Sequence, residues 1–241
     1  MAQAGRVVAD TPALIGEHVR PGVTTAELDA IAEEFITSHR GFPTFKGYRG
    51  YPASTCISPN DMVVHGIPGP YELADGDIVS VDIGVTLDGF VGDSSFTFSV
   101  GEISADAERL LEVCQAALAA GVDQCRPGNR LSDISHAVQQ VTEAAGFSVV
   151  RSLVGHGVGR SMHEDPQIPN YGPPGRGPLL AEGMTFAIEP MINAGGPEIY
   201  VHDDDWSIST ADESLSAHFE HTVAITAAGP RILTAAPVLL R

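Results

Sequence analysis

The chain has 241 residues, of which 13 are Lys or Arg and 31 are Asp or Glu, giving a formal charge of −18. So acidic a chain lacks the basic surface that broad nucleic-acid binding requires. Its three cysteines cannot all pair, and no apolar run approaches the ~18 residues of a membrane-spanning helix, so we expect a cytoplasmic protein with reduced thiols.

Two segments of the chain resemble one another at a constant offset of 106 residues. RPGVTTAELDAIAEEF at 20–35 matches RPGNRLSDISHAVQQV at 126–141, with Arg-Pro-Gly identical. Duplicated segments of this kind tend to pack about a pseudo-twofold axis. We therefore predict one domain over residues 1–241, built of two repeat-related halves at about 1–102 and 103–241.

Apolar periodicity predicts a helix in each repeat and one between them. Thr24 and Glu27 form a capping-box pattern that begins the first helix, and a second helix over 104–120 is expected to end at Gly121 as its C-cap. The apolar stripes of the repeat helices are Leu28, Ile31, Ala32, Phe35 and Ile36 in the first, and Ile134, Ala137, Val138, Val141 and Ala145 in the second.

Runs rich in β-branched and aromatic residues predict strands. They lie at 77–86, 89–100, 184–192 and 219–226. In the first run Asp82 alternates with Val79, Val81, Ile83 and Val85, so its carboxylate projects from a strand whose other face is apolar and expected to be buried.

Four acidic residues occupy matching places in the two halves. LADG at 73–76 matches LAEG at 180–183, and an acid lies six residues after the glycine of each motif, Asp82 in the first half and Glu189 in the second. A second acid precedes a Thr-containing apolar run in each half, Asp93 in one and Glu220 in the other. Four carboxylates meeting at the interface of the halves would repel one another unless cations held them. The pattern predicts a metal site.

Histidines add to this prediction. His156 stands between two glycines in GHGVGRSMHEDPQ, where the backbone can approach a crowded site, and we expect a loop that presents both His156 and His163. Carboxylates with one or two imidazoles and no thiolate favour Mn²⁺, Fe²⁺ or Co²⁺ over a structural zinc. Two such ions would acidify a shared water and polarise a carbonyl, which predicts hydrolysis.

The ordered motifs around these residues resemble the methionine aminopeptidases of the pita-bread M24 metallopeptidase family. They are VVHGIPG at His65, VDIGV at Asp82, GFVGDSSFTF at Asp93, GHGVGRSMHEDPQ, GMTFAIEPM at Glu189 and FEHTVAIT at Glu220. The resemblance implies an α+β pita-bread fold with two pseudo-twofold-related halves and an antiparallel sheet covered by helices. It further implies removal of N-terminal methionine, before a small second residue, by a hydroxide that bridges two divalent ions of Co, Mn, Fe or Zn.

The resemblance also implies a role for individual residues. The expected metal ligands are Asp82, Asp93, His156, Glu189 and Glu220, with Asp93 and Glu220 bridging. The expected catalytic groups are His65 and His163, which would hydrogen-bond the substrate, and Glu189 as a proton shuttle. The expected methionine pocket comprises Phe45, Tyr48, Tyr51, Met162 and Trp206, where Phe45 replaces the small residue of relatives. One Na⁺ or K⁺ ion is expected near the backbone of Asn60, Met62 and Ser216.

Glu220 follows Glu189 by only 31 positions, too few for the helical insertion of type II enzymes, so the resemblance implies a minimal bacterial-like type I form. Two alternative functions are less favoured. Aminopeptidase P and prolidase share the metal pattern but add an N-terminal domain, whereas only about twenty residues precede the first repeat here. A non-catalytic pita-bread protein would have lost its metal ligands, whereas all five ligand positions are filled here. The expected partners of a monomer are nascent or newly synthesised polypeptides and, transiently, the ribosome, without specific nucleic acid or membrane.

Overall fold

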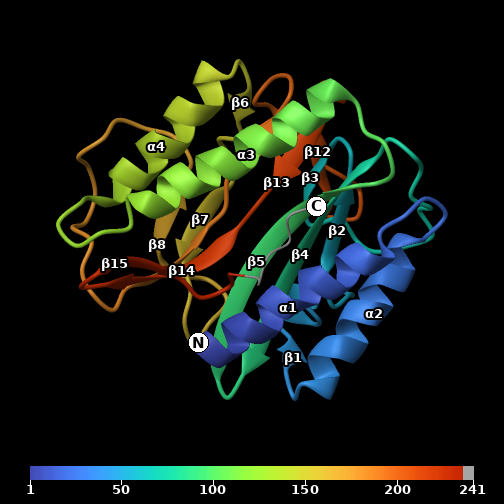
Figure 1. Cartoon of the computed structure of the whole chain (residues 1–241), viewed down its shortest axis with the longest axis horizontal. Coiled ribbons are helices and arrows are strands. Elements are labelled where there is room, and N and C mark those ends of the chain that lie inside the picture. The colour runs from blue at the N-terminus through green and yellow to red at the C-terminus, as the bar shows by residue number, and fades with distance from the viewer. Residues whose placement is uncertain (236–241) are drawn as a thin grey trace.

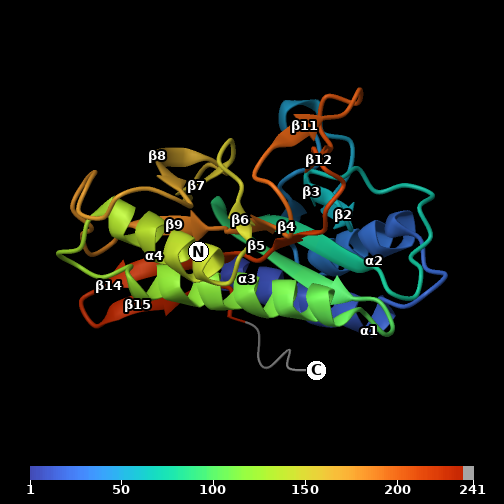
Figure 2. The same cartoon turned by 90° about the horizontal axis from the view of Figure 1, so that it is seen from above.

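A computed structural model describes residues 1–235 of the chain. Helices cover one side of a set of antiparallel sheets, and the strands within 154–169 and 199–210 rise from the other side (Figures 1 and 2). The α-helices of this described part are α1 (Ala2–His18), α2 (Thr25–Ser38), α3 (Ala105–Asp123) and α4 (Leu131–Ala144), with a 3₁₀ turn η1 at Tyr48–Gly50.

The strands fall into four sheets, and every pairing among the described strands is antiparallel. The first sheet holds β1 (Phe42–Pro43), β2 (Cys56–Pro59), β4 (Ile78–Leu87) and β5 (Phe90–Ser99). The largest holds β7 (Val154–Gly157), β8 (Glu164–Pro169), β9 (Thr185–Ile188), β14 (His221–Thr226) and β15 (Gly229–Ile232). The two smaller sheets are β6 (Ser148–Val149) with β10 (Met191–Asn193) and β13 (Ser216–His218), and β3 (Met62–Val64) with β11 (Ile199–Val201) and β12 (Ile208–Thr210).

The two repeat helices begin in the same way, although the sequence predicts a capping box only for the first. The backbone N–H of Thr24 donates to the Glu27 carboxylate at 2.8 Å, and that of Arg130 donates to Asp133 at 2.7 Å. Each first-turn acid thereby satisfies a donor that the helix leaves unpaired. Isolated bridges at equivalent places, Thr24 with Glu72 and Arg130 with Leu179, repeat the match. These paired features support two repeat-related halves, and the boundary at residue 102 stays a prediction.

The long hairpin of β4 and β5 is the platform for the site. Val79, Val81, Ile83 and Val85 are fully buried in a core shared with α1 and α2, as the alternation in β4 predicts. The opposite face therefore carries Asp82. In the hairpin register Asp82 lies opposite Ser95 and Gly84 opposite Asp93, so the two aspartates lie diagonally on one face of the sheet.

Helix α3 extends beyond its predicted end. It runs to Asp123 and is capped by Gln124, so the prediction of Gly121 as C-cap is wrong. Gly121 is instead a packing position: a Cβ there would lie 2.9 Å from Val138 of α4 and 3.4 Å from Ile188 of β9. The glycine lets α3 approach α4 and the sheet closely.

Two predicted strands differ from the structure at an acidic residue. The run 184–192 divides into β9 and β10, which belong to different sheets, because Pro190 has no N–H to donate to a ladder. The run 219–226 begins as a strand only at His221, since the backbone N–H of Glu220 instead donates to the Ser95 carbonyl of β5. Both glutamates thus lie at breaks where the chain crosses between sheets.

Candidate metal centre

The four predicted carboxylates and His156 line one cavity of about 170 Å³. Asp82 and Asp93 come from the β4–β5 hairpin, His156 from β7, and Glu189 and Glu220 from the two strand breaks. Single oxygen or nitrogen atoms of Asp93, His156 and Glu220 lie within 4.8 Å of one another. The prediction that these acids converge is confirmed by the geometry, whereas their role as ligands stays a prediction.

Hydrogen bonds between β5 and the segment 220–222 hold the two halves together at this point. The Thr222 hydroxyl accepts from the Asp93 N–H at 2.9 Å and donates to the Asp93 carbonyl at 2.8 Å. The Ser94 hydroxyl donates to the Glu220 carbonyl at 2.6 Å, and the Glu220 N–H donates to Ser95 at 2.9 Å. Asp93 and Glu220 therefore meet because their backbones are joined, although 127 positions separate them.

His156 lies on a strand, so the prediction of a loop presenting both imidazoles is wrong for this residue. Its Nδ1 lies 2.8 Å from the Gly157 carbonyl, which only accepts hydrogen bonds, so Nδ1 carries the proton. Nε2 is then the unprotonated nitrogen, 3.3 Å from Glu189 Oε1 and 3.7 Å from Asp93 Oδ2. An imidazole fixed in this tautomer by a carbonyl is a typical metal ligand.

The glycines beside His156 have the function that the sequence predicts. A Cβ at Gly155 would lie 2.5 Å from the Ala187 carbonyl oxygen, and one at Gly157 would overlap the Asp165 carbonyl oxygen. A side chain at either position would push β7 away from β8 or β9. Only glycine permits the close approach that sets His156 against the acids.

Unpaired oxygens show that the cluster suits a cation. Asp82 Oδ1, Asp93 Oδ1 and Glu220 Oε1 are buried without any hydrogen-bond partner among residues 1–235. Buried polar atoms are rarely left unpaired, because the loss of solvation is costly. Three unpaired acidic oxygens beside an unprotonated imidazole nitrogen, with no thiolate, form a donor set that fits divalent ions of the Mn²⁺, Fe²⁺ and Co²⁺ class.

Burial disfavours the charged form of every one of these groups. It raises the pKa of Asp82 to about 7 and the pKa of Asp93, Glu189 and Glu220 well above their usual range. The neighbouring carboxylates raise the pKa of the last three further. Burial lowers the pKa of His156, which is therefore neutral near pH 7. Without metal, the cluster retains protons that divalent ions would displace.

The raised pKa of the four carboxyl groups predicts that metal binding releases protons. When metal-free protein is titrated with Mn²⁺ between about pH 6 and 8, we expect the binding enthalpy to vary with the ionisation enthalpy of the buffer. The carboxyl groups must lose protons to bind the ion, whereas neutral His156 has none to lose at Nε2. Affinity should accordingly fall as the pH is lowered. Asp82→Asn should release fewer protons, and a buffer-independent enthalpy in the unchanged protein would contradict the assignment.

The two predicted catalytic histidines line the same cavity. His163 lies in the loop just before β8, with its ring centroid 4.3 Å from that of His156, and its Nδ1 is hydrogen-bonded to the Tyr48 hydroxyl at 2.8 Å. Burial, followed by the charge of His163, lowers the pKa of His65 to about 4. The pKa of His163 is lowered by burial and by His156 and Arg49. Both imidazoles are therefore neutral near pH 7.

All five predicted pocket residues also line this cavity, and their roles stay predictions. Phe45 and Tyr51 pack edge to face with ring centroids 6.5 Å apart, and Tyr51 packs in the same way on Trp206 at 5.1 Å. Met162 is buried, while Tyr48 and Trp206 are only partly covered. The Phe45 side chain is 8% exposed and points into the apolar cluster that includes Met162.

The predicted monovalent-cation residues lie outside this cavity. The Ser216 N–H donates to the Asn60 carbonyl at 2.9 Å, and Met62 lies in β3 next to β12. The three residues thus lie on neighbouring segments of backbone, but the Asn60 carbonyl already accepts a hydrogen bond from Ser216. Their binding of Na⁺ or K⁺ stays a prediction.

Sequence reasoning missed four residues with a place in the site. Cys56 and Arg49 line the cavity, Thr222 joins β5 to β14, and the Asn170 amide donates to the Glu189 carbonyl at 3.0 Å. Strand alternation could have identified Cys56, since β2 pairs with β4 and sets Cys56 opposite Asp82. Burial raises the pKa of its thiol well above the usual value, so it is uncharged. The contacts of Thr222 and Asn170 leave no comparable pattern in the sequence.

Comparison with known proteins gives a consistent family. The model of metallopeptidase family M24 matches residues 1–227. A methionine aminopeptidase of Clostridium perfringens is 56% identical over 97% of this chain and 94% of its own length, and methionine aminopeptidase 1 of Bacillus subtilis is 53% identical over the same shares.

Solved structures agree with the sequence comparison. The crystal structure of methionine aminopeptidase from Rickettsia prowazekii matches 97% of this chain and 95% of its own with a TM-score of 0.96 at 45% identity. The prolidase from Pyrococcus furiosus matches with a TM-score of 0.76 at 22% identity, and this chain covers 62% of its length. The second likeness shows a shared fold alone.

Proposed function

The chain belongs to metallopeptidase family M24, and on that premise we propose that it is a type I methionine aminopeptidase. It removes the N-terminal methionine from newly synthesised polypeptides whose second residue is small. One observation carries this proposal: the buried carboxylates and His156 share a single cavity with an aromatic-lined apolar pocket. The reacting bond and the side chain to be recognised would thus lie next to one another.

The residues that would hold two divalent ions are Asp82, Asp93, His156, Glu189 and Glu220, with Asp93 and Glu220 contacting both ions. Co, Mn, Fe and Zn are the candidate metals. When bound, the ions supply Lewis acidity, which lowers the pKa of a water and polarises the substrate carbonyl. The unpaired oxygens of Asp82, Asp93 and Glu220 support the role of these residues as ligands.

Three side chains would then act on the substrate. His65 and His163 are neutral, so each can donate one N–H to a substrate oxygen, and the Tyr48 hydroxyl orients the ring of His163 from its other nitrogen. The Glu189 carboxylate would take a proton from the attacking water and deliver it to the leaving amine. The free α-amine of the substrate would lie at the acidic end of the cavity.

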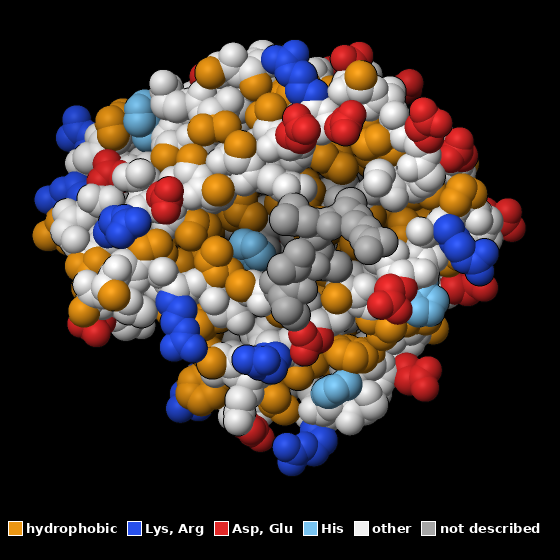
Figure 3. All heavy atoms as spheres, in the orientation of Figure 1, with side chains coloured by type: hydrophobic (Ala, Val, Ile, Leu, Met, Phe, Trp, Pro, Cys, Tyr) orange, Lys and Arg blue, Asp and Glu red, His pale blue; other side chains and the backbone are white. Residues whose placement is uncertain are grey.

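The partners and location follow from the substrate. Newly synthesised polypeptides are made in the cytoplasm, which we propose as the site of action of a monomer in transient contact with ribosomes. On the helix-covered face, acidic and basic side chains are interspersed over the described residues, without one continuous basic area (Figure 3). Within residues 1–235, no helix has the length and apolar character that crossing a membrane requires. A Na⁺ or K⁺ ion near Asn60, Met62 and Ser216 is part of the same proposal.

Tripeptides that differ only in the second residue test the proposed specificity. We expect kcat/KM on Met-Ala-Ser to exceed that on Met-Leu-Ser by about 10–200-fold or more, because the larger second side chain must enter a confined part of the site. Release of free methionine measures both rates. N-acetyl-Met-Ala-Ser should not be cleaved, and equal rates on the two unblocked peptides would contradict the proposal.

A further inference from the structure

The segment 44–55, between β1 and β2, carries three of the five pocket residues but has little regular structure. Apart from the short turn η1 it lacks a helix or strand, and Gly47, Arg49 and Gly50 have φ of 83°, 50° and 92°. A non-glycine residue at positive φ is unfavourable unless its surroundings impose that conformation. The position of Tyr48 and Tyr51 in the cavity must therefore be set by contacts made elsewhere.

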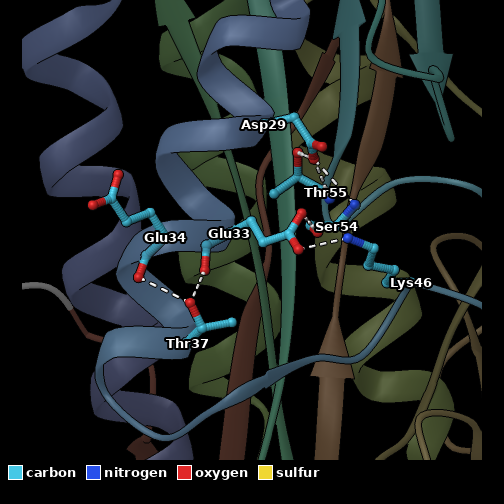
Figure 4. Close-up of polar contacts among 7 residues, drawn as sticks. All are labelled: Asp29, Glu33, Glu34, Thr37, Lys46, Ser54 and Thr55. Carbon is cyan, nitrogen blue, oxygen red and sulfur yellow. Dashed lines mark hydrogen bonds and ion pairs between the residues drawn. The ribbon is translucent and has the colours of Figure 1, made fainter.

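Helix α2 supplies those contacts through two acidic side chains that lie one turn apart (Figure 4). Asp29 Oδ1 accepts three hydrogen bonds, from the Ser54 N–H at 3.1 Å, the Thr55 N–H at 2.8 Å and the Thr55 hydroxyl at 2.7 Å. Glu33 accepts from the Ser54 hydroxyl at 2.9 Å and pairs with Lys46. The helix thereby holds the segment close to both of its ends.

The two acids do not contribute equally. The Glu33–Lys46 pair is exposed at both partners, 36% and 45%, and exposed ion pairs contribute little. Ser54 and Thr55 are fully buried, so loss of the Asp29 acceptor would leave backbone N–H groups without a partner. Asp29 therefore determines where this end of the segment lies.

A short series of contacts leads from Asp29 to the cavity. The carbonyl of Thr55 accepts a hydrogen bond from the Tyr51 hydroxyl at 3.0 Å, and the same hydroxyl lies 2.8 Å from the Gly66 carbonyl. The ring of Tyr51 packs edge to face on Trp206. A shift of Thr55 would consequently move Tyr51 and loosen its contact with Trp206, although Asp29 itself does not line the cavity.

We propose that Asp29 is a positioning residue that acts through Thr55 and Tyr51 to set the width of the cavity receiving the first side chain of the substrate. This inference rests on the proposed function. The selectivity for methionine then depends partly on the Asp29 carboxylate, which contacts the segment 44–55 but does not line the cavity. Glu33 and Lys46 assist at the other end with a smaller effect.

Kinetics of Asp29→Ala on Met-Ala-Ser and Leu-Ala-Ser test this role. We expect KM for Met-Ala-Ser to rise about tenfold while kcat stays within about threefold, and the preference for Met over Leu to fall about tenfold. Asp29→Asn keeps an oxygen at the position that accepts all three hydrogen bonds. Its KM for Met-Ala-Ser and its preference for Met over Leu should therefore lie close to those of the unchanged protein. The matched control is Glu34→Gln, which changes one charge on the exposed side of the same helix.

Fluorescence of Trp206, the single tryptophan, gives a readout that does not depend on activity. In metal-free Asp29→Ala we expect increased quenching by acrylamide, because Tyr51 no longer packs firmly against the indole. Thr55→Val, which removes one donor to Asp29, should show a smaller change of the same kind and serves if Asp29→Ala does not fold.

The outcomes separate the two proposals. If the unchanged protein fails to cleave Met-Ala-Ser, the proposed function is wrong, and quenching of Trp206 alone decides the positioning role. If the unchanged protein is active, an unaltered KM, selectivity and quenching in Asp29→Ala would overturn the inference. A fall in kcat alone, with KM and selectivity unchanged, would also overturn it, since it would indicate a merely structural role.

Discussion

Asp93→Asn is expected to abolish peptidase activity and to lower the metal content of the purified protein while leaving the fold intact. The amide offers one neutral oxygen where the carboxylate offers two charged ones, so contact with both ions is lost. Removing a residue that hydrogen-bonds a metal ligand typically lowers activity by about 10–100-fold, and the loss of kcat/KM in Asp93→Asn should be larger. Peptide hydrolysis, elemental analysis and far-UV circular dichroism measure the three effects.

The stability of the metal-free variant makes this prediction sharper. Without metal, burial and then the charge of Asp82 raise the pKa of Asp93, and burial followed by the charges of Asp93, Glu189 and Asp82 raises the pKa of Glu220. Because the metal-free cluster retains protons, replacing the Asp93 carboxyl group by a neutral amide should leave the melting temperature of the metal-free protein unchanged or higher. The control Asp88→Asn removes an exposed charge from the β4–β5 turn. A fully active, fully metallated Asp93→Asn protein would show that Asp93 is not a ligand common to both metal ions.

Removal of metal by a chelator should have an equally large effect. We expect activity to fall to background and to return on addition of Mn²⁺ or Co²⁺. The melting temperature should rise on reloading, because ligand at about 100 times its Kd contributes about 2.7 kcal/mol. For a chain of this size that corresponds to about 5–10 °C. Calorimetry and peptide hydrolysis on the same samples measure both quantities.

The variant Asp93→Asn is again the control for the chelator. Its melting temperature should respond little to added Mn²⁺, because one shared ligand is missing. Undiminished peptidase activity after verified removal of metal would contradict the account, and so would a melting temperature that does not depend on metal in the unchanged protein.

Local sequence rules predicted the elements that carry the acids. The capping box at Thr24 and the alternation of Asp82 with buried valines were both confirmed, because each depends on neighbours within a few positions. The predictions failed where a distant segment decides. Gly121 continues its helix because α4 packs against it, and the strand after Glu220 begins late because the Glu220 N–H donates to Ser95 of β5.

The candidate site was predictable as a set of residues but not as an arrangement. The repeat and the family motifs named the ligands, while the joining of β5 to β14 through Thr222 appears only in three dimensions. The same holds for Asp29, whose partners Ser54 and Thr55 lie 25 and 26 positions away. A threonine or an aspartate making such contacts has no distinctive sequence pattern, so its role could not be inferred before the fold was known.

Anomalous diffraction from crystals grown with Mn²⁺ tests the central claim most directly. The account predicts two peaks inside the cavity, both within bonding distance of Asp93 and Glu220, with His156 Nε2 at one of them. A well-ordered cavity in which Mn²⁺ at saturating concentration gives no peak beside these carboxylates would contradict it.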